Sequence, residues 1–127
     1  MPRIKFQSSK TNLRLHELKA IALLLEYFNQ DIVCLATSFG KTPDIEINGK
    51  RWELKSPIGD GPKTLENIIR KASHQSENII IDLTRIKMNQ NQALARIRFF
   101  LKTTNHSIRN LLVITKGGKI LELMKKK

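Results

Sequence analysis

The sequence is poor in cysteine and in aromatic residues, and each shortage excludes a class of site. Cys34 is the single cysteine among 127 residues, so the chain forms no internal disulfide and no metal site with two thiolates. Its apolar surroundings, Ile-Val-Cys-Leu-Ala, are typical of a buried small side chain rather than a nucleophile. One tryptophan, one tyrosine and five phenylalanines supply no aromatic platform for stacking single-stranded bases.

Long apolar runs are also missing. No stretch approaches the ~20 apolar residues of a transmembrane helix. The N-terminal residues Met-Pro-Arg-Ile-Lys-Phe-Gln include no apolar run of the kind that a signal peptide needs. We therefore expect no signal peptide and no transmembrane segment in this sequence, and a protein that acts in the cytoplasm.

Acidic residues are scarce relative to basic ones. Lysine and arginine total 23 against 11 acids, which gives a net charge of +12 and a pI near 10.2. Such a charge attracts polyanions, so we expect nucleic acid as the partner, with binding that weakens as salt rises. A membrane surface is the competing partner, but no helix here is both long and basic-amphipathic. A ribosomal-type or architectural basic protein is the alternative that composition leaves open.

The length and the 40% hydrophobic content favour a single domain, 1–127, with a substantial core. Hydrophobic periodicity predicts an α/β fold, with helices on both faces of a central mixed β-sheet. Residues 1–11 are expected to form a basic arm and residues 125–127 a basic tail. The expected helices span about 13–29, 65–77 and 91–102, and the expected strands 31–36, 42–47, 50–55, 79–83, 111–115 and 120–124.

The most informative stretch is the predicted hairpin. Asn48-Gly49 favours a two-residue type I′ turn, because both residues tolerate positive φ. Such a turn fixes the register, so that Ile45 faces Trp52, Glu46 faces Arg51 and Asp44 faces Glu53. Lys55 follows Glu53 by two residues and shares its face of the strand, ~6.6 Å farther along at ordinary strand rise.

The predicted register places the carboxylates of Asp44 and Glu53 side by side, where they repel each other. A divalent cation between them removes the repulsion, since Mg²⁺ takes oxygen ligands. The ammonium of Lys55 can then contact a metal-bound water or a phosphate oxygen. The alternative is a surface hairpin in which both acids are merely solvated.

The first predicted helix carries a carboxylate on its apolar arc. Glu17 lies in the middle of that arc, where an acid is costly unless it is paired or bound to metal. The alternative is a buried salt bridge, for example with Arg14 or Lys55. Asn12 is the expected cap, and the other residues of the arc are apolar: Leu13, Leu18, Ile21, Leu24, Leu25 and Phe28.

Pro43-Asp44 and Glu53-Leu54-Lys55 resemble the signature of the PD-(D/E)xK nucleases. This resemblance implies a restriction-endonuclease-like core in which Asp44 and Glu53 bind Mg²⁺ or Mn²⁺, the carbonyl of Leu54 adds a ligand, and Lys55 assists the chemistry. It also implies that Glu17, from the first helix, reaches the metal site.

Gln75 matches a glutamine that related nucleases carry near the metal-bound water or the substrate. It extends the apolar stripe of the second predicted helix, for which Thr64 is the expected cap. The match is partial, because Ile79 stands where some relatives have tyrosine, and Gln75 could instead cap a buried backbone group. His74 could serve as a general acid, although a surface histidine is the simpler interpretation.

Within that superfamily, the sequence from Pro43 to Pro57, followed by Ala-Ser-His-Gln and Ile-Ile-Ile-Asp-Leu, is similar to the toxin nucleases of contact-dependent growth inhibition (CdiA-type) proteins. The resemblance covers roughly residues 13–83. Several of those toxins cleave transfer RNA, so it implies transfer RNA as the first substrate, DNA as the second, and a cognate immunity protein as a partner.

Two alternatives remain beside the toxin. One is a DNA endonuclease or resolvase of a phage or mobile element, and the other is a non-catalytic nucleic-acid-binding module with the same fold. For any of them, the expected phosphate contacts are basic side chains, each of which could instead be part of a solvated face: Lys41, Lys63, Arg70, Lys71, His74, Arg96, Arg98 and Lys102.

Overall fold

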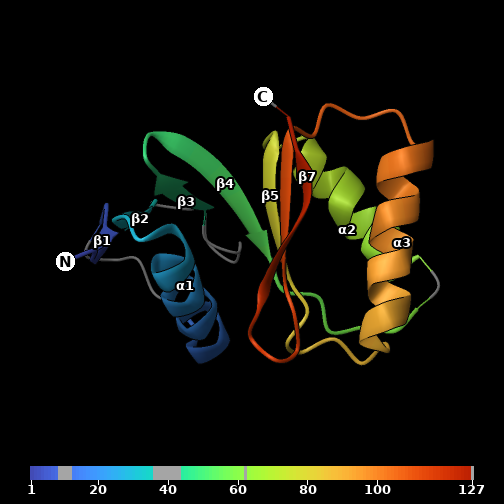
Figure 1. The fold of residues 1–127 in the computed structure, drawn as a ribbon, viewed down its shortest axis with the longest axis horizontal. Coiled ribbons are helices and arrows are strands. Elements are labelled where there is room, and N and C mark those ends of the chain that lie inside the picture. The colour runs from blue at the N-terminus through green and yellow to red at the C-terminus, as the bar shows by residue number, and fades with distance from the viewer. Residues whose placement is uncertain (9–12, 36–43, 62, 127) are drawn as a thin grey trace.

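The chain folds around one mixed β-sheet, in which the strands lie side by side in the order in which they occur in the sequence (Figure 1). In the computed structural model, residues 1–8, 13–35, 44–61 and 63–126 are described, and within them the sheet has seven strands, ordered β1 to β7. The strands are β1 (Ile4–Phe6), β2 (Ile32–Cys34), β3 (Asp44–Ile47), β4 (Lys50–Lys55), β5 (Asn78–Asp82), β6 (Asn110–Ile114) and β7 (Ile120–Lys125). The helices of the described residues are α1 (Leu15–Phe28), α2 (Thr64–Ser73) and α3 (Gln90–Thr103).

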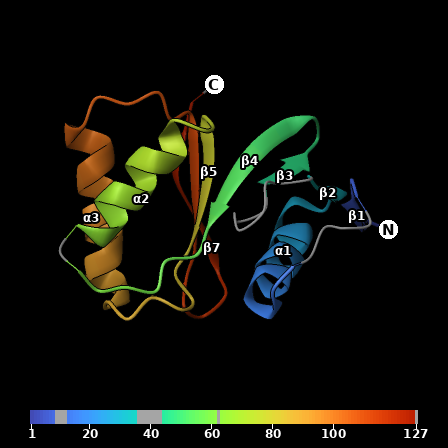
Figure 2. The ribbon, with the colours of Figure 1, turned by 180° about the vertical axis from the view of Figure 1, so that it is seen from behind.

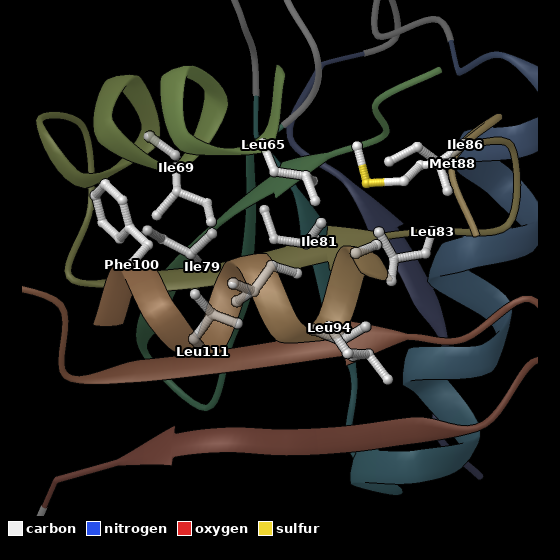
Figure 3. Close-up of a cluster of buried hydrophobic side chains, with 14 of the residues drawn as sticks. Leu65, Ile69, Ile79, Ile81, Leu83, Ile86, Met88, Leu94, Phe100 and Leu111 are labelled. Atoms are coloured by element: carbon white, nitrogen blue, oxygen red, sulfur yellow. The ribbon is translucent and has the colours of Figure 1, made fainter. Parts of the chain in front are cut away.

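The helices cover opposite faces of the sheet, as the two views in Figures 1 and 2 show. Helix α1 packs on one face together with apolar side chains from β2, β3, β4, β5 and β6. Helices α2 and α3 pack on the other face, where the second apolar cluster lies (Figure 3). The predicted α/β architecture, with helices on both faces of a mixed sheet, is confirmed.

Strands β5 and β6 are buried on both faces of the sheet. Strand β5 is parallel to β4 and to β6. Its side chains alternate between the two clusters, because Ile79 and Ile81 contact the α2–α3 layer whereas Ile80 contacts the α1 layer. Parallel strands buried in this way are near-continuous apolar runs, and Asn-Ile-Ile-Ile-Asp fits that rule.

Strand β1 lies within the stretch for which we expected only a basic arm. Ile4–Phe6 pairs in parallel with Ile32–Cys34 at one edge of the sheet. Asp31 helps to hold it there, because its Oδ1 accepts a hydrogen bond from the Arg3 amide at 2.8 Å and its Oδ2 lies 3.0 Å from Lys5 Nζ. A three-residue strand has too little periodicity to be predicted from sequence.

Two helices begin or end differently from the prediction. Helix α1 begins at Leu15 with Arg14 as its cap, and the expected cap Asn12 lies outside the described residues. Leu18, expected in the core, is 42% exposed, because the buried stripe of α1 includes Ala20, which was not predicted, as well as Ile21 and Leu24. Helix α2 includes Thr64, so that residue is not the cap, and it ends at Ser73 rather than near residue 77.

Candidate metal-binding and active site

The hairpin of β3 and β4 forms in the predicted register. Asn48 and Gly49 have φ angles of 52° and 76°, as a type I′ turn requires. Ile45 is paired with Trp52, Glu46 with Arg51 and Asp44 with Glu53. The expected partner of Lys55 on the first strand, Thr42, lies outside the described residues, as does Pro43 of the motif.

The alternation of the hairpin separates apolar from charged side chains. Ile45, Trp52 and Leu54 are buried in the cluster beneath α1. Glu53 points to the opposite face, because it is paired in parallel with Ile79 of the α2–α3 cluster. The carboxylates of Asp44 and Glu53 therefore lie next to each other on the charged face, and Lys55 lies one step farther along that face.

Glu53 is the most deeply buried group of this face, with 3% of its side chain exposed. Its Oε1 lies 3.3 Å from the Lys55 ammonium, and its Oε2 is buried without a hydrogen-bond partner in the described part of the chain. Burial, together with the neighbouring Asp44 carboxylate, raises the pKa of Glu53 to about 7, against the opposing effect of Lys55.

These observations fit a divalent cation. A buried carboxylate oxygen without a partner, next to a second carboxylate, is an incomplete set of oxygen ligands. A cation between Asp44 and Glu53 would provide the missing partner and would remove their repulsion. The carbonyl of Leu54, between Glu53 and Lys55 on the same strand, is the further ligand that we proposed from the sequence.

Arg51 belongs to the charged face and was not among the residues predicted for the site. Its guanidinium forms an ion pair with Oδ2 of Asp44. The sequence held a signal for it, because Arg51 precedes Glu53 by two residues and so shares its face of the strand. The site thus has two acids, Asp44 and Glu53, and two bases, Arg51 and Lys55.

Glu17 lies on α1, at the other face of the sheet. It is 5% exposed, and its Oε1 accepts a hydrogen bond from the backbone amide of Arg14 at 2.8 Å. This is one half of a capping box, in which the third helical residue binds the amide of the cap. Among the described residues, no group of three or more Asp, Glu, His or Cys side chains could hold a metal ion. The structure therefore does not bring Glu17 together with Asp44 and Glu53.

Gln75 and His74 lie beyond the last residue of α2. Both are exposed, so the prediction that Gln75 continues a helical apolar stripe is wrong. The chain turns here because the amides of Gln75 and Ser76 bond to the carbonyl of Ala72. The hydroxyl of Ser76 then donates to the carbonyl of Arg51 at 3.1 Å, and this bond ties the turn to the start of β4.

The predicted phosphate contacts divide into three groups. The first group is exposed on or next to α2 and α3: Lys63, Lys71, His74, Arg98 and Lys102. Arg70 and Arg96 are engaged within the protein: Arg70 lies 5.8 Å from the centre of the Phe100 ring, and Arg96 lies 4.0 Å from an oxygen of Glu66. Lys41 lies outside the described residues.

The chain is anchored directly after Lys55. The hydroxyl of Ser56 donates to Oδ2 of Asp82 at 3.3 Å, and Asp82 is 1% exposed. The other oxygen of Asp82 accepts bonds from the amide and the hydroxyl of Thr84 at 3.0 and 2.7 Å. These bonds fix the ends of β4 and β5 relative to each other, and so restrict the backbone that carries Lys55.

No helix of the described residues combines the length and the apolar character needed to cross a membrane.

Comparison with known proteins supports the resemblance to the toxin domains of CdiA-type proteins. No curated protein gives a significant match. The chain is similar to a solved structure described as "CdiA-CT/CdiI toxin and immunity complex from Burkholderia pseudomallei", with a TM-score of 0.63 and 18% identity over 93% of this chain and 97% of that chain. At this identity the likeness shows a shared fold. Residues 41–120, more than half of the chain, match the family described as contact-dependent growth inhibition CdiA C-terminal domain. The chain therefore belongs to the CdiA C-terminal domain family of contact-dependent growth inhibition, which places it among bacterial toxin domains.

Proposed function

We propose that this domain is a metal-dependent endonuclease of the PD-(D/E)xK type that hydrolyses phosphodiester bonds in nucleic acid. The observation that carries the proposal is the charged face of the hairpin. There, a buried Glu53 oxygen without a partner lies beside Asp44, and the Lys55 ammonium lies 3.3 Å from the other Glu53 oxygen.

Asp44 and Glu53 would hold Mg²⁺ or Mn²⁺, with the carbonyl of Leu54 as an additional ligand. When bound, such an ion lowers the pKa of a water molecule and neutralises negative charge on a phosphate. Lys55 contributes a positive charge close to Glu53, where it stabilises the charge that develops on the phosphate oxygens. Burial of Glu53 keeps bulk water away from this carboxylate, and the bond between Ser56 and Asp82 restrains the strand end that carries Lys55.

Transfer RNA is the proposed first substrate and DNA the second. The net charge of +12 supports a polyanionic substrate, and the exposed Lys63, Lys71, Arg98 and Lys102 supply cations around α2 and α3. Membership of the toxin family favours transfer RNA over DNA. A cognate immunity protein is the proposed protein partner, because the similar structure is a toxin bound to its immunity protein.

The test is cleavage of purified transfer RNA, plasmid and linear DNA in Mg²⁺, in Mn²⁺ and in EDTA. We expect discrete transfer RNA fragments that require metal. Glu53→Gln and Lys55→Ala are each expected to slow cleavage by about 10²–10³-fold, the usual effect of removing one group that stabilises charge in the transition state. Glu46→Gln is the matched control, because it removes an acid from the same face of the hairpin, beyond the Asp44–Glu53 pair, and should retain cleavage.

Each other outcome leads to a definite conclusion. Metal-dependent cleavage of DNA alone would make the domain a DNA endonuclease of the same mechanism. Salt-sensitive binding of nucleic acid without cleavage in any metal would contradict the enzyme and support a binding module. Equal loss in Glu46→Gln and Glu53→Gln would contradict the assignment of the site.

A further inference from the structure

We propose that Arg51 is a phosphate-binding residue of the hairpin site, which pairs with Asp44 until a divalent cation binds that carboxylate and then contacts the substrate phosphodiester. The inference rests on the nuclease function proposed above and extends it to a residue outside the signature.

The first observation is the partner that Arg51 takes. In the register of the hairpin, Arg51 is directly opposite Glu46, the acid that a simple cross-strand pair would use. The guanidinium instead forms its ion pair with Asp44, the diagonal neighbour. The Arg51 side chain therefore extends along β4 toward the Asp44–Glu53 pair, and not straight across the hairpin toward Glu46.

The second observation is that the backbone of Arg51 is fixed whereas its side chain remains accessible. Its carbonyl accepts hydrogen bonds from Ser76 Oγ at 3.1 Å and from Asn78 Nδ2 at 3.0 Å. The amide of Asn78 is itself held by Asn110, whose Nδ2 donates to Asn78 Oδ1 at 2.7 Å. The Arg51 side chain is nevertheless 53% exposed, against 15% for Asp44. A fixed base with an exposed guanidinium suits a group that must meet a large substrate.

The charge of the site changes when a metal ion binds. Asp44 and Glu53 as carboxylates, with Arg51 and Lys55, sum to zero, so the site without metal has no net attraction for phosphate. A divalent cation brings the four groups and the ion to +2, and it competes with the guanidinium for the oxygens of Asp44. Arg51 then needs another anionic partner. Its planar fork of donors matches the oxygens of a phosphodiester.

The experiment measures metal binding and cleavage separately in four proteins. They are the wild type, Arg51→Gln, Arg51→Lys and Lys50→Gln. Lys50→Gln is the matched control, because it removes one positive charge from the adjacent, exposed position of the same strand, on the other face. Mn²⁺ affinity is measured by isothermal titration calorimetry without nucleic acid, and cleavage is measured in single turnover at saturating Mn²⁺.

Arg51→Gln is expected to bind Mn²⁺ about three- to tenfold more tightly than the wild type, because a competing cation has been removed. At saturating Mn²⁺ it is expected to cleave 10²-fold or more slowly, on the order of the effect of losing one charge-stabilising donor. Arg51→Lys should keep the wild-type Mn²⁺ affinity and recover only part of the cleavage rate, since it retains the charge but not the fork. Lys50→Gln should match the wild type in both measurements.

The opposite results overturn the inference. If Arg51→Gln and Lys50→Gln have the same Mn²⁺ affinity and the same rate, Arg51 is a surface ion pair and the nuclease assignment stands without it. A wild type that binds no Mn²⁺ would refute the proposed metal site itself, and the role of Arg51 with it. If the wild type binds Mn²⁺ but cleaves nothing, the proposed nuclease function fails, and the phosphate-binding role of Arg51 fails with it.

Discussion

The two faces of the β3–β4 hairpin are built from alternate residues of the same two strands, yet they have opposite energetic roles. The face toward α1 buries Ile45, Trp52 and Leu54, each with at most 5% of its surface exposed. The other face holds two adjacent carboxylates, one of which, Glu53 at 3%, is buried as deeply as the apolar residues. The first face stabilises the sheet, and the second reduces its stability.

This difference indicates which residues the fold needs and which the proposed function needs. Apolar burial contributes roughly 25 cal/mol per Å², so the face toward α1 offsets part of the conformational entropy that is lost when the hairpin is ordered. A buried acid whose pKa is raised to about 7, such as Glu53, lowers the stability of the folded protein when it is ionised. Sites that are kept for chemistry are commonly strained or electrostatically unfavourable in this way. The comparison therefore predicts different consequences for mutations on the two faces.

The largest effect is expected on the apolar face. Trp52→Ala should lower the free energy of unfolding by about 3–5 kcal/mol, the range for removing a buried aromatic residue. Trp52 is 5% exposed and its ring lies 5.7 Å from that of Phe28, centre to centre, so the deletion leaves a cavity between the sheet and α1. Urea denaturation followed by circular dichroism measures the change.

Trp52→Phe is the control for this variant, because it keeps an aromatic side chain against Phe28. It should lose clearly less stability than Trp52→Ala. A loss below about 1 kcal/mol in Trp52→Ala would show that the apolar face does not support the hairpin, and the contrast between the two faces would disappear.

An effect of intermediate size is expected from pH on the charged face. The pKa of Glu53 is raised from 4.5 to about 7 in the folded protein. Between these values the unfolded chain releases this proton whereas the folded protein keeps it, so stability falls as pH rises through that window. At about 1.4 kcal/mol per pKa unit, the metal-free protein should lose on the order of 3 kcal/mol from this group between pH 4.5 and pH 7.

Glu53→Gln isolates this contribution, because it keeps the shape of the side chain and removes the ionisation. Acids outside the Asp44–Glu53 pair, such as Asp31 with its lowered pKa, change stability in the opposite direction, and their effect is the same in both proteins. Urea denaturation in EDTA at pH 5, 6, 7 and 8 measures the free energy of unfolding of both proteins. That of the variant should increase relative to that of the wild type as pH rises. A constant difference between the two proteins would mean that Glu53 is ionised in the folded state across the whole range.

Both faces of the hairpin could be predicted from sequence because their cause is local. Asn48-Gly49 determines the turn, the turn fixes the register, and the register assigns every side chain to a face. The apolar run of β5 was predictable for a similar reason, since a strand buried on both faces needs no alternation. The carboxylate pair and Lys55 followed from the same rule.

Other parts of the site depend on contacts that are distant in sequence. Helix α2 ends early because the chain must turn back so that Ser76 and Asn78 can reach the carbonyl of Arg51. Arg51 pairs with Asp44 rather than with Glu46, and this preference depends on side-chain conformation, which the strand register does not determine. Leu18 was misplaced because the buried stripe of α1 is rotated relative to the predicted arc.

Glu17 is an acid on α1, the helix that covers the apolar face of the hairpin. Its replacement should give the smallest of the three effects on stability. Its Oε1 accepts a hydrogen bond from the Arg14 amide. The prediction that Glu17 is a metal ligand did not anticipate this bond. Glu17→Ala should cost about 1 kcal/mol of unfolding free energy, within the range for loss of a helix cap. Glu17→Gln should cost less, because glutamine also serves at this position of a capping box. Urea denaturation compares the two, and calorimetry with Mn²⁺ separates capping from metal binding. If Glu17 only caps α1, the Mn²⁺ affinity of Glu17→Gln equals that of the wild type. A tenfold or greater loss of affinity in that variant would show that Glu17 reaches the metal from the other face of the sheet.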